Sequence, residues 1–420
     1  MLKIFSLLLL KKADLLHTSA PSRHFWSIVA IFIGLGFYVG VWTVLVADLA
    51  VALKLSSILL GIALSCFSCA GIVLLVFGSA LANRLTRKLI LFLGVGGLGL
   101  FFLILAFLSQ LVVLFVLLVF GGACASCYDL AVNTIGGDYE RYYAQRTMTL
   151  FHAGFSGGAA LGSLGSAIAL ANGIGFRVIY GITGLLFLLL AGATLFLPLP
   201  SMVSIPAARD ANVEEHSTST SSTIVLLVTP LVLFATILVS LSFFTDGVLE
   251  GYTSVYLSNL LGSGTLLGGM GIAAFYLVGM IGRLSSTTAL RQYGDRPVIT
   301  IAGMLSALGM VVTLSTTSAL LAVSGLLLVG LGQSPLVPTA FSLATRRGSH
   351  QSARAVAIVT AFGYSVFLIS PLLIGFVATL FSLRIALLLT IATSLGVVLI
   401  AQRRPLSTYK EEEEERDSDV

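Results

Sequence analysis

The stretch Phe25–Val46 reads FWSIVAIFIGLGFYVGVWTVLV and contains no charged residue. An apolar stretch of about twenty residues is long enough to cross the hydrocarbon core of a bilayer as a helix. Comparable stretches recur along the chain as far as Ala401. Because backbone polar groups in lipid must be satisfied within their own segment, each stretch is expected to be helical. The sequence therefore predicts an all-α membrane protein.

Apolar stretches of this kind follow one another along the whole chain. Hydrophobic residues make up 57% of the sequence and charged residues only 10%, which is far more apolar surface than one soluble core buries. Judged against the length needed to span a bilayer, the chain contains about twelve transmembrane helices. They are Phe25–Val46, Ser56–Phe77, Lys88–Leu108, Leu111–Ile135, Met148–Leu170, Phe176–Leu197, Thr223–Thr245, Leu266–Ser286, Val298–Leu314, Ala319–Ala344, Val356–Leu380 and Arg384–Ala401.

The basic residues predict how these helices are oriented. With both termini in the cytoplasm, only Lys54, Arg177 and Arg384 of the 23 Lys and Arg residues lie outside. Cytoplasmic loops of membrane proteins carry this excess of Lys and Arg. The bias favours a multi-pass protein of the bacterial inner (plasma) membrane. It also accounts for the net charge of +5 without any binding of nucleic acid.

The composition changes in the middle of the chain, where residues 200–222 combine charged residues with a Ser/Thr run. This is typical of a flexible linker, here a cytoplasmic one. Two six-helix halves around such a linker are the layout of many secondary transporters, which bind substrate at the midplane between the halves. The expected organisation is a cytoplasmic N-terminal segment (1–24), an N-terminal bundle (25–199), the linker (200–222), a C-terminal bundle (223–402) and an acidic cytoplasmic tail (403–420).

A short basic loop between the second and third expected helices is repeated between the eighth and ninth. The first copy runs from Gly78 to Lys88, and the second begins at Gly282-Arg283. Glycines allow two helices to approach closely, and basic side chains favour the negative ends of helices. Residues of these loops are expected to take part in gating or conformational change, namely Gly78, Arg84, Arg87, Lys88, Gly282 and Arg283.

The first loop resembles the signature loop of the major facilitator superfamily. It shares Gly78, Arg84, Arg87 and Lys88 with that signature, and it departs from it at Asn83 and Thr86, where the family has Asp and Gly. The resemblance covers nearly the whole span from Phe25 to Gln402. It implies the major facilitator fold, with two six-helix bundles that work by alternating access.

A finer resemblance concerns the fourth and fifth expected helices. The segments Asp129-Leu-Ala-Val-Asn133, Glu140-Arg141 and 151–158 are similar to the fucose–proton symporter branch and related bacterial permeases. That branch has an acidic residue and an Asn four positions later in the fourth helix. Drug–proton antiporters usually have an Arg in the fourth helix and a Gly-Pro motif in the fifth, and neither occurs here. The resemblance implies symport of a sugar or a related small polar solute.

Asp129 is the first candidate for proton coupling. A carboxylate within a span is costly and usually faces a cavity or a partner. Asn133 lies one helical turn further on the same face and is a candidate for substrate binding. His152 has a side chain that titrates near neutral pH and could relay protons to Asp129. The alternatives are a structural anchor for Asp129 and a packing role for His152.

Other polar residues are expected near the outer end of the spans or beside prolines. Asp246 and Glu250 are spaced by one helical turn near the outer end of the seventh helix, where glycines allow bending. Gln333 precedes Pro335 and Pro338, which free backbone carbonyls for a substrate wall or form a hinge. Solvated loops and interface aromatics are the alternative interpretation. The expected substrate-binding residues are Trp42, Glu250, Tyr252, Tyr256 and Gln333, and the expected gating residues at the outer end are Asp48 and Asp246.

No cofactor is expected. The pairs Cys66/Cys69 and Cys124/Cys127 have a spacing that places both thiols on one helix face, but they lack neighbouring His or Met residues for a soft-metal path, so a packing role is favoured. No nucleotide-binding loop is present, which leaves an ion or solute gradient as the source of energy. An intramembrane enzyme would need a nucleophile or metal cluster that the sequence does not offer.

The sequence therefore predicts a secondary active transporter of a small polar solute, coupled to protons by symport. A proton-driven exporter of drugs or metabolites and a transporter-like sensor remain alternatives. The expected partners are the solute, a proton or other cation and the lipid bilayer, and such a fold can act as a monomer.

Overall fold

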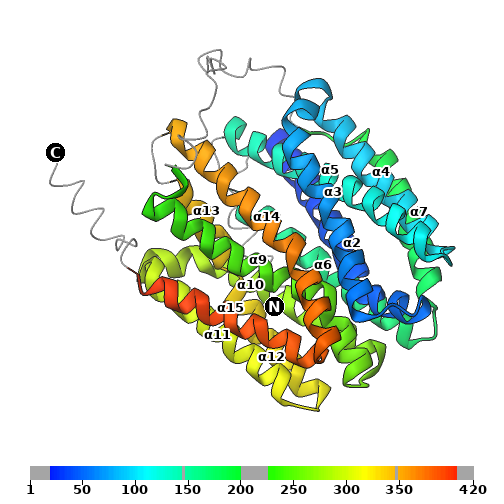
Figure 1. Cartoon of the computed structure of the whole chain (residues 1–420). Helices are drawn as coiled ribbons and strands as arrows, with labels where there is room; N and C mark the ends of the chain where they lie inside the picture. Colours follow the sequence, from blue (N-terminus) through cyan, green and yellow to red (C-terminus); the bar gives the residue numbers. More distant parts are fainter. Residues whose placement is uncertain (1–18, 144–146, 200–225, 346–348, 404–420) are drawn as a thin grey trace, which may run out of the picture.

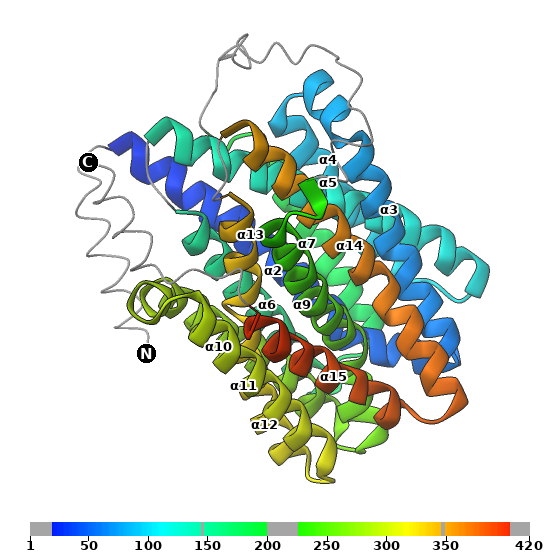
Figure 2. The ribbon, with the colours of Figure 1, turned by 60° about the vertical axis from the view of Figure 1, so that its left-hand side comes forward.

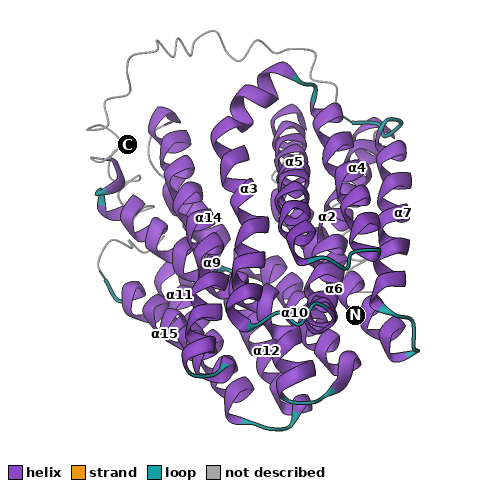
Figure 3. Ribbon diagram, turned by 45° about the vertical axis from the view of Figure 1, so that its right-hand side comes forward, coloured by secondary structure: helices purple, strands orange, loops and turns teal. Residues whose placement is uncertain are grey.

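The computed structural model describes residues 19–143, 147–199, 226–345 and 349–403, with side chains for all of these except 19–22, 71–84, 141 and 345–354. Within these ranges all regular secondary structure is helical (Figure 3). The predicted linker at 200–222 and most of the predicted terminal segments (1–18 and 404–420) lie outside the described residues. The all-α fold class is therefore confirmed for the part that the structure describes.

The N-terminal half consists of helices whose order follows the predicted spans. A polar side chain before a helix can cap its first turn. At the start of α4, the Thr86 hydroxyl accepts a hydrogen bond from the amide of Leu89 at 3.3 Å. A hydroxyl at this position satisfies an amide that has no partner within the helix. The helices are α2 (Ser19–Ala52), α3 (Ser57–Arg84), α4 (Arg87–Ala106), α5 (Leu111–Tyr143), α6 (Met148–Ala171) and α7 (Phe176–Thr194).

The C-terminal half repeats this arrangement with one interruption. The predicted tenth span is divided at Ser334–Pro335, because a proline has no amide to continue the hydrogen-bond ladder. The helices are α9 (Pro230–Val255) with a π-helical extension η1 (Tyr256–Leu260), α10 (Gly264–Tyr293), α11 (Asp295–Ser315), α12 (Ala319–Gln333), α13 (Leu336–Thr345), α14 (Ser349–Leu380) and α15 (Leu383–Ala401).

Eleven helices in the described residues are long and apolar enough to cross a membrane, and Ser57–Ala70 of α3 adds a shorter apolar segment. Many large apolar side chains on these helices face outward, as expected for surfaces that contact lipid. In Figure 1 the blue and cyan helices of the first half gather on one side, and the green to red helices of the second half gather on the other. The expectation of two helical bundles is met by this arrangement.

Glycine allows unusually close packing inside the first half. A Cβ atom at Gly158 of α6 would lie 2.0 Å from the carbonyl oxygen of Ile33 in α2, and one at Gly36 would lie 1.8 Å from the carbonyl oxygen of Phe155. Only a residue without a side chain permits backbones to approach this closely. Helices α2 and α6 therefore form a tightly fixed pair beside the second half.

The ends of the helices define two faces of the molecule. The terminal face is where α2 begins and α15 ends, and the far face is where α2 ends at Ala52 and α15 begins at Leu383. Toward the far face, α3 and α14 run side by side (Figures 1 and 2). There the Ser65 hydroxyl donates a hydrogen bond to the carbonyl oxygen of Leu368 at 2.8 Å.

Two further hydrogen bonds join the halves in the same region. The hydroxyl of Tyr252, which donates to the carbonyl oxygen of Pro371 in its own half at 2.9 Å, also lies 3.5 Å from the carbonyl oxygen of Ser57 in α3. The hydroxyl of Ser254 donates to the carbonyl oxygen of Val44 at 3.0 Å. The far-face closure, defined as the bonds from Tyr252 to Ser57, from Ser254 to Val44 and from Ser65 to Leu368, thus joins α9 to α3, α9 to α2 and α3 to α14. It ties the two halves together between the cavity described below and the far face.

Candidate functional site

A cavity of about 220 Å³ lies between the two halves. Helices α2, α3, α5 and α6 of the first half form part of its wall, and α9 and α14 of the second half complete it. Aromatic rings cover much of the wall, and the rings of Trp42 and Phe67 stack with centroids 5.6 Å apart. The position agrees with a binding site between the halves of a transporter fold.

Asp129 lines this cavity and is held by donors from two directions. The side-chain amide of Asn133 donates to its Oδ1 at 2.9 Å, and the hydroxyl of Tyr364 donates to its Oδ2 at 3.1 Å. Asn133 belongs to the same helix, α5, whereas Tyr364 belongs to α14 in the other half. The carboxylate therefore takes part in a direct contact between the halves.

Glu250 lines the cavity from the second half. The hydroxyl of Tyr276 in α10 donates a hydrogen bond of 2.7 Å to its Oε1. Asp246 lies one helical turn earlier on α9, and both carboxylates are within electrostatic reach of the Arg283 guanidinium. The sequence predicts these acidic residues near the outer end of the seventh span. Because α9 and η1 continue to Leu260, they lie near the middle of this helix instead.

Arg283 also makes a contact between the halves. Its Nη1 donates a hydrogen bond to the hydroxyl oxygen of Ser156 in α6, and that hydroxyl in turn donates to the carbonyl oxygen of His152 at 3.1 Å. The ring of His152 packs edge-on against Phe32, with centroids 5.3 Å apart. No direct hydrogen bond between His152 and Asp129 occurs among the described side chains, so a relay between them stays a prediction.

Four residues predicted to bind substrate are not among those that line the cavity. Asn133 is engaged by Asp129, and the hydroxyl of Tyr252 contacts the carbonyl of Pro371. The hydroxyl of Tyr256 donates to the carbonyl oxygen of Thr313 at 3.2 Å. The fourth is Gln333, described next. A role for these four residues in substrate binding stays a prediction, whereas Trp42 and Glu250 do line the cavity.

Gln333 is buried within the second half. Its Oε1 accepts a hydrogen bond from the hydroxyl of Ser242 at 2.8 Å, and its Nε2 donates to the hydroxyl of Ser306 at 2.9 Å. Buried amides need such partners because an unpaired polar group in an apolar surrounding is costly. The polar residue beside the prolines is therefore satisfied by its own bundle.

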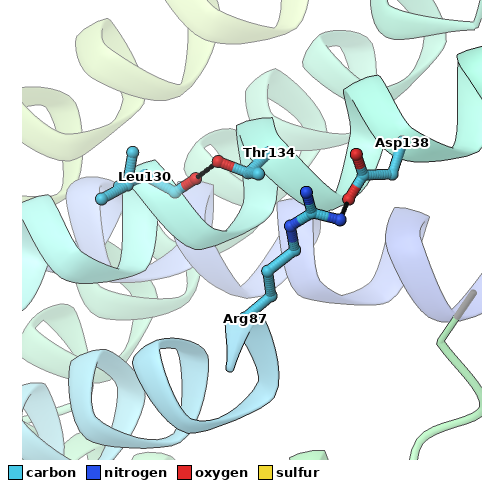
Figure 4. A network of polar contacts seen from close by, with 4 residues as sticks. All are labelled: Arg87, Leu130, Thr134 and Asp138. Carbon is cyan, nitrogen blue, oxygen red and sulfur yellow. Dashed lines mark hydrogen bonds and ion pairs between the residues drawn. The ribbon is translucent and has the colours of Figure 1, made fainter. Parts of the chain in front are cut away.

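Four of the predicted gating residues lie at the end of α3 or at the start of α4, namely Gly78, Arg84, Arg87 and Lys88. At the terminal face, Arg87 at the start of α4 forms an ion pair with the buried Asp138 of α5 (Figure 4). Near this pair on α5, Thr134 donates to the carbonyl oxygen of Leu130 at 2.6 Å. Lys88 follows Arg87 and is partly exposed. Gly78 and Arg84 lie in the section of α3 whose side chains are outside the described residues.

The remaining gating candidates lie elsewhere. Asp48 is partly buried near the far-face end of α2, within electrostatic reach of the buried Tyr180 of α7. Gly282 in α10 faces Ser334, and a Cβ atom there would lie 2.1 Å from the Ser334 hydroxyl oxygen. Gly282 therefore allows α10 to pack against the break between α12 and α13. A gating role for these residues stays a prediction.

The structure adds residues that sequence reasoning missed. Tyr364, Tyr276 and Ser156 each contact a charged group of the site, and Asp138 pairs with Arg87. A tyrosine or serine in an apolar span gives no signal of its own, because the same residue types are common in helix packing. Asp138 is acidic and close to Asp129 in the sequence, so the search for intramembrane carboxylates could have found it.

Metal ligands do not gather in this site. Among the described residues, no group of three or more His, Cys, Asp or Glu side chains could hold a metal ion. The four cysteines are free, in two pairs on α3 and α5.

Comparisons with known proteins agree with this architecture. The model of the Major Facilitator Superfamily matches residues 26–350 and 288–419. An uncharacterized MFS-type transporter of Yersinia pestis is 27% identical over 383 residues, which is 88% of this chain and 94% of that protein. The membrane protein MosC of Rhizobium meliloti is 34% identical over a shorter stretch of 163 residues, 39% of this chain and 40% of that protein.

Two solved structures share the fold. A mutant of the nucleoside transporter NupG superposes with a TM-score of 0.73 at 13% identity, over 90% of this chain and 98% of that one. A bacterial homologue of the human lysosomal transporter Spinster, described as inward-facing and unoccupied, gives 0.73 at 12% identity, over 91% and 96% of the two chains. At these identities the similarity concerns the fold alone.

Proposed function

The chain belongs to the major facilitator superfamily, and from that premise we propose that it is a proton-coupled symporter of a small polar solute. As a member of this family it is a multi-span membrane transporter and not an enzyme. The proposal adds the coupling ion, the direction of proton movement relative to the solute, and the residues responsible.

The observation that carries the proposal is the bond between Asp129 and Tyr364. Asp129 lines the cavity in one half, and the hydroxyl that donates to it belongs to the other half. Protonation removes the charge that makes the carboxylate a strong acceptor, so it weakens a contact between the halves. A residue that both meets the cavity and bridges the halves can link proton binding to alternating access.

The other residues take roles that follow from their positions. Trp42 and Glu250 line the cavity and serve as contacts for the solute. Arg283 neutralises part of the acidic charge on α9 and joins α10 to α6 through Ser156. Opening the far face requires the three hydrogen bonds of the far-face closure to break. With both termini in the cytoplasm of a bacterial cell, the described conformation is closed toward the outside.

The test is proton flux in liposomes. We would reconstitute the purified protein with an internal pH-sensitive dye and add pools of sugars, amino acids, amines, organic acids and nucleosides in turn. Symport predicts acidification of the compartment that the solute enters. The Asp129→Asn protein should lose this acidification while it still exchanges labelled solute across the membrane, because exchange needs no net release of protons.

The matched control is Asp48→Asn. Asp48 belongs to α2, in the same half as Asp129, and does not line the cavity. It is expected to keep the ratio of protons to solute, even if the rate changes. Solute entry with proton exit would make the protein an antiporter, and solute uptake with no proton movement in the unmodified protein would make it a uniporter. Either result overturns the proposal.

A further inference from the structure

The cavity wall carries acidic side chains and no basic side chain. Asp129 and Glu250 are among the residues that line it, and none of the lining residues is Lys, Arg or His. Asp246 adds a third carboxylate one turn from Glu250. Arg283 is within electrostatic reach of Asp246 and Glu250, and its guanidinium also donates to Ser156. Three carboxylates thus lie in or beside the cavity with one guanidinium close to two of them, and the site favours a ligand that brings positive charge.

The two lining carboxylates differ in how their oxygens are used. Both oxygens of Asp129 accept a hydrogen bond, one from Asn133 and one from Tyr364. On Glu250, Oε1 accepts from Tyr276, whereas no donor to Oε2 occurs among the described residues. An ionised carboxylate offers about four acceptor sites, so Glu250 retains capacity for a donor supplied by a ligand.

The rest of the wall is suited to a carbon skeleton and to a cation. Six aromatic side chains line the cavity, namely Tyr38, Trp42, Phe67, Phe155, Tyr364 and Phe367. Cations are attracted to the faces of aromatic rings, most strongly to that of Trp. The volume of about 220 Å³ is below the range of pockets that hold drug-sized ligands, which begins at about 300 Å³.

We propose that the cavity binds a small organic monocation, an amine carried on an apolar ring or short chain, with its ammonium group on Glu250 and its carbon skeleton against Trp42 and Phe67. The inference rests on the proposed function only in that the bound amine is the transported solute. Because Glu250 receives the amine and Asp129 receives the proton, the two positive charges occupy separate carboxylates and can travel together.

Neutral and anionic solutes fit this site less well. A neutral alcohol of the same shape can donate a hydrogen bond to Glu250 but leaves the negative charge without a counterion. A carboxylate ligand would be repelled by both lining acids. The charge of the ligand, at constant shape, is therefore the variable to test.

The sequence provides a reporter inside the cavity. The chain has two tryptophans, Trp26 and Trp42, and Trp26 is 49% exposed near the terminal face. The Trp26→Phe protein thus keeps Trp42 as its sole tryptophan, and its fluorescence reports binding. The probes are 2-phenylethylamine, 2-phenylethanol and phenylacetate, which carry positive, zero and negative charge on the same ring, and cyclohexylmethylamine with cyclohexylmethanol as a non-aromatic pair.

Each amine is expected to bind about tenfold or more tightly than its alcohol, and phenylacetate more weakly than either. Glu250→Gln should lower amine affinity about tenfold and leave alcohol affinity unchanged, since Gln still accepts from Tyr276 and retains the shape. Unchanged alcohol binding also shows that this variant is folded. The control Asp295→Asn removes a carboxylate at the start of α11, outside the cavity, and should leave amine affinity as it is.

Equal affinities for amine and alcohol, stronger binding of phenylacetate, or absence of amine binding in both series would overturn the inference. The proposed function fails separately. Amine binding that depends on Glu250, without proton-coupled flux in liposomes, keeps the inference and removes the symporter. Proton-coupled flux of a neutral solute, without amine binding, keeps the symporter and removes the inference.

Discussion

The hydroxyl of Tyr364 lies 3.1 Å from Oδ2 of Asp129, so that α14 of one half is bonded directly to the central carboxylate of α5 in the other. Tyr364 and Asp129 both line the cavity. A ligand or proton that reaches Asp129 therefore acts on the contact between the halves at the same time.

Tyr364→Phe removes this donor and keeps the aromatic ring in the cavity wall. A hydrogen bond to a charged group contributes about 1.5–3 kcal/mol, so uptake driven by a pH gradient should fall about tenfold or more. Exchange of labelled solute without a gradient should fall much less. Both are measured in liposomes, with Tyr142→Phe, an exposed tyrosine outside the cavity, as the control. Equal loss in both assays would mean that Tyr364 shapes the site without coupling it.

Arg283→Ala should destabilise the protein strongly, because it leaves Asp246 and Glu250 without their guanidinium. Removal of one partner from a buried charge cluster costs about 3–5 kcal/mol. Thermal unfolding in detergent should show this loss, and the double variant Arg283→Ala with Asp246→Asn should recover part of it. A double-mutant cycle gives the coupling directly. Additive effects of the two substitutions would separate Arg283 from Asp246.

Arg87→Ala leaves Asp138 buried without its cation at the terminal face. Because Arg87 is itself 39% exposed, the loss should stay below that of a fully buried pair, at about 1–3 kcal/mol. Removing both charges with Arg87→Ala and Asp138→Asn should restore stability toward that of the unmodified protein. The midpoint of thermal unfolding decides the matter, and a double variant less stable than Arg87→Ala would contradict the pairing.

Gly158→Ala tests the close packing of α6 on α2. The added methyl group would lie 2.0 Å from the carbonyl oxygen of Ile33, so the helices must separate, and the cost should be about 1–3 kcal/mol. Gly165→Ala in the same helix meets nothing within 4 Å and serves as the matched control. It should be neutral or slightly stabilising, since Ala favours helix more than Gly does. Equal effects at both positions would exclude packing as the cause.

The architecture was predictable from sequence because each span leaves its own mark. An apolar run such as Phe25–Val46 has one stable form in a bilayer, and the basic loops separate one run from the next. Span boundaries are harder to predict: the predicted seventh span ends at Thr245, whereas α9 continues to Val255 and η1 to Leu260. Glu250 therefore lies within this helix, on the cavity wall, and not near its outer end.

The site was predictable only where a residue is expensive in lipid. Asp129 is predictable because a carboxylate within a span needs a reason, whereas the sequence predicts Glu250 only as a residue of the outer end of the seventh helix. Tyr364 is not predictable, because its partner lies 235 positions away and only the packing of the halves brings them together. Gln333 is the converse case: it is polar and deep, and Ser242 and Ser306 satisfy its amide within one half, so its predicted contact with substrate has no support from the cavity.

The donors of the far-face closure are side chains, whereas its acceptors belong to the backbone. Each of its three bonds runs from a side-chain hydroxyl to a backbone carbonyl, with Ser65, Tyr252 and Ser254 as donors. A carbonyl is present whatever residue carries it, so substitutions at Leu368 or Val44 leave the acceptor in place. In a saturation library selected for growth on the solute, the positions that do not tolerate substitution should therefore be unevenly distributed. Most substitutions that abolish growth would map to the three hydroxyl residues. The residues that supply the carbonyl oxygens would tolerate substitution.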